Sequence, residues 1–133
     1  MITALLSTAP WLMLAAALLW LHSLRSKNFG HVDILWPLHH IIACFAVCVA
    51  MPQLEWRGIL LLLLVTAWGI RLATFLAVRA VGREEDRRYA AIRANQGPSF
   101  KFTSLFIIYL LQAMIALVIC AAFVPIVESA APW

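Results

Sequence analysis

The chain has 133 residues, of which 65% are hydrophobic and 12% are charged, and its formal net charge is +4. Soluble domains are about half apolar and about a quarter charged, so this composition excludes an ordinary soluble domain and indicates an integral membrane protein. Its length allows one compact transmembrane domain over residues 1–133. The positive charge lies in loops between apolar segments, where topology and anionic lipid head groups explain it, so we expect no nucleic-acid partner.

Four apolar segments are long enough to cross about 30 Å of hydrocarbon as helices. In chain order they cover approximately residues 4–21, 34–51, 58–78 and 103–127. No positive residue precedes the first segment, whereas Arg25 and Lys27 follow it, so we expect a retained span rather than a cleaved signal peptide. The predicted fold is an all-α membrane bundle of four transmembrane helices, surrounded by membrane lipids.

The second apolar segment opens with the sequence HVDILWPLHH. Asp33 is the predicted N-cap of this span, because its carboxylate can accept backbone N–H groups of the first turn. At helical spacing Asp33, Trp36 and His40 share one face. His39 and His40 are adjacent and cannot both bind one metal from a regular helix, so no metal site is predicted. His40 is more simply an interfacial histidine than a proton carrier.

The third segment contains an arginine well inside the apolar run. An arginine within a membrane helix costs about 2.5–3.5 kcal/mol on insertion scales, so Arg71 needs a partner or a wet cavity. Arg79 lies about 80° from Arg71 around the helix and about 12 Å further along it. Both guanidinium groups can therefore line one groove and bind the phosphates of a nucleotide. In the alternative interpretation Arg79 reaches the lipid head groups and Arg71 pairs with Asp33.

The loop after the third span carries most of the charge of the chain. Residues 83–93 are predicted to form a short interfacial helix between Gly82 and the breakers that follow it. Glu84 and Arg88 are an i, i+4 pair on this helix, and Asp86 and Tyr89 share one stripe. The alternatives are a solvated charged helix, or a stripe that contacts a ligand at the membrane surface.

Polar and sulfur side chains are sparse within the apolar segments. Tyr109 and Gln112 are neighbours in the fourth span, where Gln112 is expected to bond another helix and, as the minor alternative, to contact a ligand. Cys44, Cys48 and Cys120 show no metal or redox spacing and are interpreted as small packing residues.

The orientation in the membrane follows from the basic residues of the loops. The first and third loops hold eight of them, and the second loop holds only Arg57. The eight are Arg25, Lys27, Arg79, Arg83, Arg87, Arg88, Arg93 and Lys101. Because basic residues favour the cytoplasmic side, we expect the first and third loops in the cytoplasm and both termini outside.

These residues together resemble a known pattern. It consists of VDILW at Val32–Trp36, WGIRL at Trp68–Leu72, Arg79 with Gly82, EDRRY at Glu85–Tyr89, Arg93, and SLF with LLQ at Ser104–Phe106 and Leu110–Gln112. Over residues 27–112 the chain resembles the bacterial membrane-protein branch of the steroid 5-alpha-reductase superfamily, a branch long labelled as a domain of unknown function. The resemblance implies a multi-pass protein of the bacterial inner membrane.

The resemblance also implies an activity and a site. Characterised members of that superfamily use NADPH to reduce a carbon–carbon double bond conjugated to a carbonyl in a hydrophobic, lipid-like or steroid-like small molecule. By resemblance the candidate catalytic residues are Asp33, Glu85 and Tyr89. By resemblance the candidate cofactor-binding residues are Arg71, Arg79, Asp86, Arg88 and Arg93.

Members of the superfamily run on through further spans, and their carboxy-terminal half carries a signature rich in Asn, Gly, Glu, Trp and Tyr that is associated with NADPH. The sequence has no such signature, which leaves two hypotheses. In the first, the chain is a membrane reductase or its amino-terminal half, completed by a membrane partner or a second copy. In the alternative, it is a non-catalytic, truncated relative that serves as a small membrane subunit or lipid-binding module.

Overall fold

The computed structural model describes residues 2–128, and every regular element in this range is helical. Three long helices come first: α1 (Ile2–Ser26), α2 (Val32–Val49) and α3 (Trp56–Ala80). The last span is composite and consists of α5 (Phe100–Ser104), the π-helical segment η3 (Leu105–Leu110), α6 (Leu111–Cys120) and α7 (Phe123–Glu128). Short elements link these spans: η1 (Phe29–His31), α4 (Arg87–Gln96) and η2 (Gly97–Ser99).

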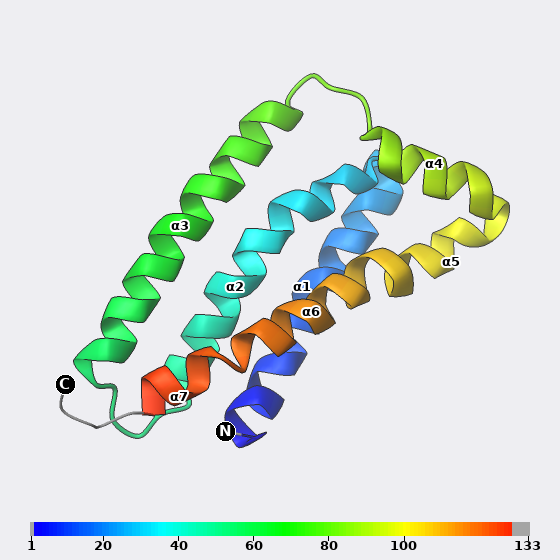
Figure 1. Ribbon diagram of the computed structural model, residues 1–133. Coiled ribbons are helices and arrows are strands. Elements are labelled where there is room, and N and C mark those ends of the chain that lie inside the picture. The colour runs from blue at the N-terminus through cyan, green and yellow to red at the C-terminus, as the bar shows by residue number, and fades with distance from the viewer. Residues whose placement is uncertain (1, 129–133) are drawn as a thin grey trace.

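Four helical segments of this range are long and apolar enough to cross a membrane, and α4 lies in the loop before the last one (Figure 1). The predicted helical bundle of four spans with a short helix in the third loop is therefore confirmed. The helices extend beyond the predicted apolar segments, with α1 reaching Ser26 and α3 reaching Ala80. A helix can continue into polar residues beyond the membrane because its backbone hydrogen bonds are formed within the helix. Hydropathy identifies only the part of the helix that lies in hydrocarbon.

α2 is the central helix and packs against α1, α3 and α6. Small buried side chains line its contacts, including Ala43 and Cys44 on α2 and Ala113 and Ala116 on α6. Small residues let helix backbones approach closely, which is the main source of helix association in a bilayer. All three cysteines are buried and free, as expected of packing residues.

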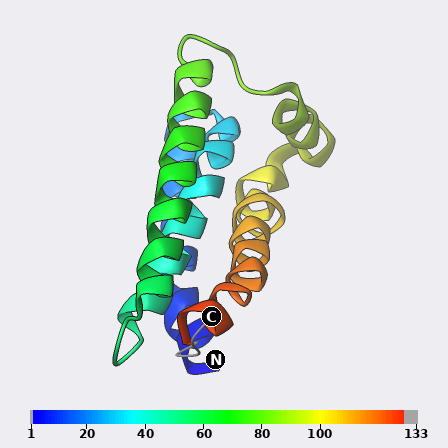
Figure 2. The same ribbon diagram turned by 60° about the vertical axis from the view of Figure 1, so that its left-hand side comes forward.

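α3 packs tightly against α2 at Gly69. A Cβ atom at this position would lie 2.7 Å from Cδ1 of Ile41 and 3.1 Å from the carbonyl oxygen of Pro37. Beyond this contact α3 runs on to Ala80, and the connection to α4 bridges from the end of α3 toward the other helices (Figures 1 and 2). The space beneath this bridge contains the candidate site.

The first and third loops meet at one end of the bundle. Nη1 of Arg93 donates to the carbonyl oxygen of Lys27 at 3.3 Å, and the N–H of Phe29 donates to Oε1 of Glu85 at 2.9 Å. The start of α1 and the short α7 lie at the opposite end (Figure 1). The two loops that carry the most basic residues therefore form a single surface.

Candidate functional site

Asp33 joins α2 to α4. Its Oδ1 accepts a hydrogen bond of 2.6 Å from the hydroxyl of Tyr89, and its Oδ2 accepts one of 2.8 Å from Nη2 of Arg88. The prediction that Asp33 caps α2 is wrong, because the helix begins at Val32 and His31 is its N-cap. The preceding 3-10 turn continues directly into α2, so the Asp33 side chain is already inside the first turn and points to α4.

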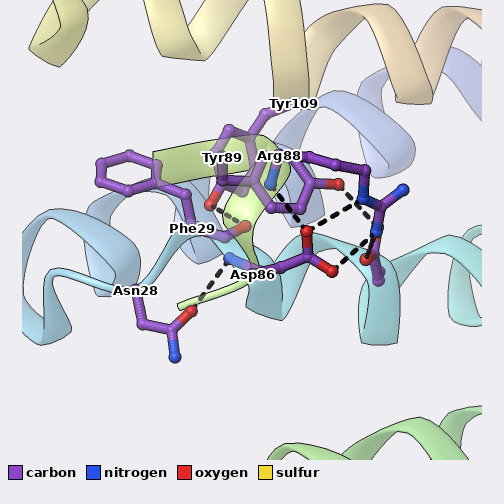
Figure 3. A network of polar contacts seen from close by, with 8 residues as sticks. Asn28, Phe29, Asp86, Arg88, Tyr89 and Tyr109 are labelled. Carbon is purple, nitrogen blue, oxygen red and sulfur yellow. Dashed lines mark hydrogen bonds and ion pairs between the residues drawn. The ribbon is translucent and has the colours of Figure 1, made fainter. Parts of the chain in front are cut away.

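α4 begins where Asp86 caps it. Oδ1 of Asp86 accepts the backbone N–H of Arg88 at 2.9 Å and its Nε at 3.0 Å (Figure 3). These hydrogen bonds from Arg88 hold the pKa of Asp86 below its ordinary value. The predicted helix start at residue 83 and the predicted i, i+4 pair of Glu84 with Arg88 are wrong, because the capping carboxylate fixes the first turn at Arg87.

Glu85 holds the first and third loops together. Its Oε1 accepts the N–H of Phe29, and its Oε2 pairs with Nη2 of Arg93 at 2.6 Å. The Glu85 side chain is 7% exposed, so this ion pair is largely shielded from water. Glu85 and Arg93 therefore form a structural clamp between the loops, and the catalytic role of Glu85 and the cofactor-binding role of Arg93 that the resemblance implies stay predictions.

A pocket of about 900 Å³ opens beneath the bridge between α3 and α4. Its volume is within the range of sites that bind small molecules and cofactors. Its polar lining consists of Asn28, His31, Asp33, Arg79, Arg83, Glu84, Glu85, Asp86, Arg87, Arg88 and Gln112. Its remaining lining consists of Gly30, Ile34, Trp36, Leu76, Ala80 and Ile115.

Four arginines and four carboxylates line the pocket, but only one of these arginines is ion-paired within residues 2–128. Arg88 is paired with both Asp33 and Asp86. Arg79, Arg83 and Arg87 also line the pocket, and none of them forms an ion pair with a residue in the range 2–128. Three arginines therefore remain available for an anionic ligand, with Glu84 as the one pocket carboxylate that has no ion pair in the described chain.

The membrane-facing part of the pocket is mostly apolar. Gln112 lies here, two residues after the end of the π-helical segment, and its Oε1 is buried without a hydrogen-bond partner among the described residues. The expected bond from Gln112 to another helix is therefore not formed. Tyr109, three residues earlier, is fully buried and donates its hydroxyl to Oγ of Ser23 at 2.7 Å.

Two predicted cofactor-binding arginines do not line the pocket. Arg93 is used by the loop clamp, and Arg71 is exposed and has no hydrogen bond or ion pair within residues 2–128. Arg71 is about 160° around α3 from Gly69, the residue that touches α2. The prediction that Arg71 and Arg79 line one groove is wrong, because Arg71 faces away from the bundle, and its proposed pairing with Asp33 is also absent.

The remaining predicted residues meet in one place. Asp33, Arg79, Asp86 and Arg88 line the pocket, and Tyr89 is buried behind its wall, where it bonds Asp33. These residues come from α2, α3 and α4, which are far apart in sequence.

Sequence reasoning missed several lining residues. No pattern in the sequence marks Asn28 and His31 as site residues, because the position of a loop residue depends on how the whole chain folds. In the sequence Arg83 and Arg87 indicate topology and a charged interfacial helix, and Gln112 is expected to bond another helix, with contact to a ligand as the minor alternative.

The two adjacent histidines have different surroundings. His40 contacts the rings of Trp36 and Trp68 at centroid distances of 4.9 and 5.6 Å, and its Nδ1 donates to the carbonyl oxygen of Trp36 at 2.9 Å. His39 is fully buried within the bundle. Among residues 2–128 no group of three or more His, Cys, Asp or Glu side chains is arranged to hold a metal ion.

The fold and the pocket define a helical, multi-pass membrane protein with a charged pocket between its spans at the end that carries the basic loops. The chain belongs to the family described as "Protein of unknown function (DUF1295)", whose model matches residues 19–132. This is a steroid 5-alpha-reductase-like family. Searches of curated proteins and of solved structures found no match to the chain.

Proposed function

We propose that the chain binds NADPH in the pocket beneath the α3–α4 bridge and takes part in reducing a conjugated double bond of a lipid-like or steroid-like enone. One observation carries the proposal. Arg79, Arg83 and Arg87 line a pocket of about 900 Å³ and have no ion-pair partner within residues 2–128. Membership of a reductase-like family supports the same conclusion.

The pocket residues fit the chemistry of this cofactor. Guanidinium groups bind phosphates through planar pairs of N–H donors, so the three unpaired arginines can hold the phosphates. The carboxylate of Asp33 is fixed by Tyr89 and Arg88 and can accept a hydrogen bond from a ribose hydroxyl. The apolar end of the pocket lies among membrane spans, where a hydrophobic substrate is soluble.

When bound, NADPH supplies a hydride to the β-carbon of the enone, and a proton added at the α-carbon completes the reduction. The chain contributes binding, orientation and shielding from water. Tyr89 keeps its hydroxyl proton directed at Oδ1 of Asp33, and Arg88 directs its charge at Oδ2. This arrangement holds the Asp33 carboxylate in one orientation at the pocket wall.

Nucleotide binding to the purified chain in detergent tests the proposal. We expect NADPH to bind the wild type and the double variant Arg79→Ala, Arg83→Ala to lose about tenfold or more in affinity, since each arginine–phosphate contact is a charge-assisted hydrogen bond. Arg25→Ala is the matched control, because Arg25 is exposed in the last turn of α1 and does not line the pocket. Absence of NADPH binding by the wild type would contradict the proposal.

A second candidate function is non-catalytic lipid binding. An apolar groove of about 670 Å³ lies between α1, α2 and α3 in the membrane-spanning part. It is lined by Ser7, Trp11, Ile41, Ile42, Phe45, Ala46, Val49, Ala50, Leu62 and Thr66. In this case the purified chain would retain a bound lipid in detergent. It would not consume NADPH when a steroid or lipid enone is added, which the absorbance of the reduced nicotinamide would show.

The proposed setting is the bacterial inner membrane, with the first and third loops in the cytoplasm, where NADPH is available. The clustering of both basic loops at one end of the bundle supports this orientation. A membrane partner or a second copy of the chain is proposed to complete the enzyme.

A further inference from the structure

The amide of Gln112 has no hydrogen-bond partner within the described chain. Its Oε1 is shielded from solvent, and neither amide atom bonds a residue in the range 2–128. Gln112 nevertheless lines the pocket. A polar group buried in a membrane span without a partner is destabilising, so a site that keeps one is expected to satisfy it in another way.

None of the described residues that line the pocket forms a hydrogen bond with Gln112. Ile34, Leu76 and Ile115 are apolar side chains of three different helices. Tyr109 is the nearest polar side chain along the same helical span, and its hydroxyl already bonds Ser23. A ligand inside the pocket is therefore the available partner for the amide.

The chemistry of an amide narrows the kind of ligand group. Gln112 presents a donor at Nε2 and an acceptor at Oε1. An enone carbonyl can accept a hydrogen bond but cannot donate one, and a phosphate that is fully ionised has the same restriction. A primary carboxamide has both groups in one plane and satisfies both amide atoms at once. The last torsion of glutamine is broad, so its amide can turn to face such a group.

We propose that Gln112 is a positioning residue for the nicotinamide carboxamide, donating from Nε2 to its oxygen and accepting its N–H at Oε1. This inference rests on the proposed binding of NADPH. It assigns the apolar end of the pocket, beside Trp36, to the ring, and the arginine end to the phosphates. Gln112 lies two residues after the end of the π-helical segment, which agrees with the frequent occurrence of π-helical turns at functional sites.

Binding of three ligands to the whole chain in detergent tests the inference. They are NADP⁺, its 3-acetylpyridine analogue and 2′-phospho-ADP-ribose. The analogue carries a methyl group in place of the carboxamide NH₂, and 2′-phospho-ADP-ribose lacks the nicotinamide ring. Gln112→Leu should weaken NADP⁺ binding about tenfold, equivalent to about 1.4 kcal/mol. Its affinity for 2′-phospho-ADP-ribose should stay unchanged. The wild type should bind NADP⁺ more tightly than the analogue, and the variant should lose this preference. Gln53→Leu, in the exposed second loop, is the matched control.

The outcomes separate the inference from the function on which it rests. If the wild type binds neither NADP⁺ nor 2′-phospho-ADP-ribose, the proposed function fails. If it binds both and Gln112→Leu retains full affinity for NADP⁺, only the inference fails. If the variant does not fold, the wild-type protein still decides, because equal affinity for NADP⁺ and the acetylpyridine analogue overturns the inference.

Discussion

The charged residues of the third loop form two groups, one that fixes the pocket wall and one that connects the first and third loops. Arg88 and Asp86 hold each other and Asp33 at the pocket wall, whereas Glu85, which also lines the pocket, pairs with Arg93 and connects the two loops. Their spacing between Glu85 and Arg93 gives no hint of this division. It depends on which side chains reach Asp33 and Phe29, residues that lie more than fifty positions earlier.

Glu85→Gln should lower the free energy of unfolding, and not only the catalytic activity. The variant keeps an oxygen for the N–H of Phe29 but leaves Arg93 without its ion-pair partner. Breaking a buried pair costs about 3–5 kcal/mol, and the 42% exposure of Arg93 reduces the expected loss to about 1–3 kcal/mol. Unfolding in mixed micelles measures it. Glu84→Gln, an exposed neighbour, is the control, and equal stability of the two variants would contradict the clamp.

Asp86 should make the start of α4 sensitive to acid. Its pKa in the folded protein is lowered by Arg88, so its stabilising contribution is complete above the ordinary aspartate pKa and is lost as the pH falls through the lowered value. Protection of the Arg88 amide from hydrogen exchange, corrected for intrinsic rates, should therefore decrease at acidic pH. Asp86→Asn should flatten this dependence, and a wild-type profile that is already flat would be the contrary result.

At the scale of elements, the position of α3 depends on one close contact with α2. Gly69 leaves room for Ile41 and for the carbonyl oxygen of Pro37. Pro37 has no backbone N–H, so it cannot donate the helical hydrogen bond to the carbonyl oxygen of Asp33, which lies one turn earlier in α2. The glycine and the proline thus place α3 and the first turn of α2 relative to each other, and both helices line the pocket.

Gly69→Val should push α3 away from α2. The added side chain would meet Ile41 at distances below van der Waals contact, and overpacking of this kind costs about 1–3 kcal/mol. We expect lower stability in detergent together with weaker nucleotide binding, because Arg79 is carried by α3. Ala67→Val, at an exposed position of the same helix, should change neither quantity appreciably.

At the scale of the whole molecule, both basic loops form one surface, so they must lie on one side of the membrane. In the proposed orientation, single cysteines introduced at Lys27 and Arg83 should be labelled from the cytoplasmic side, and one at Gln53 should be labelled from the opposite side. The native cysteines are buried and should react slowly until the protein is denatured. Labelling of Lys27→Cys and Arg83→Cys from different sides would contradict the arrangement of the spans.

Local hydropathy and helix length are enough to predict the helical class, the four spans and the membrane setting. The resemblance also points to Asp33, Arg79, Glu85, Asp86 and Arg88, which all line one pocket. Only the tertiary structure decided that Arg71 faces away, that Glu85 and Arg93 form a clamp, and that Gln112 borders the pocket. The physical reason is that helical periodicity gives angles within one helix, whereas the rotation of a helix toward its neighbours is set by packing contacts such as that of Gly69 with Ile41.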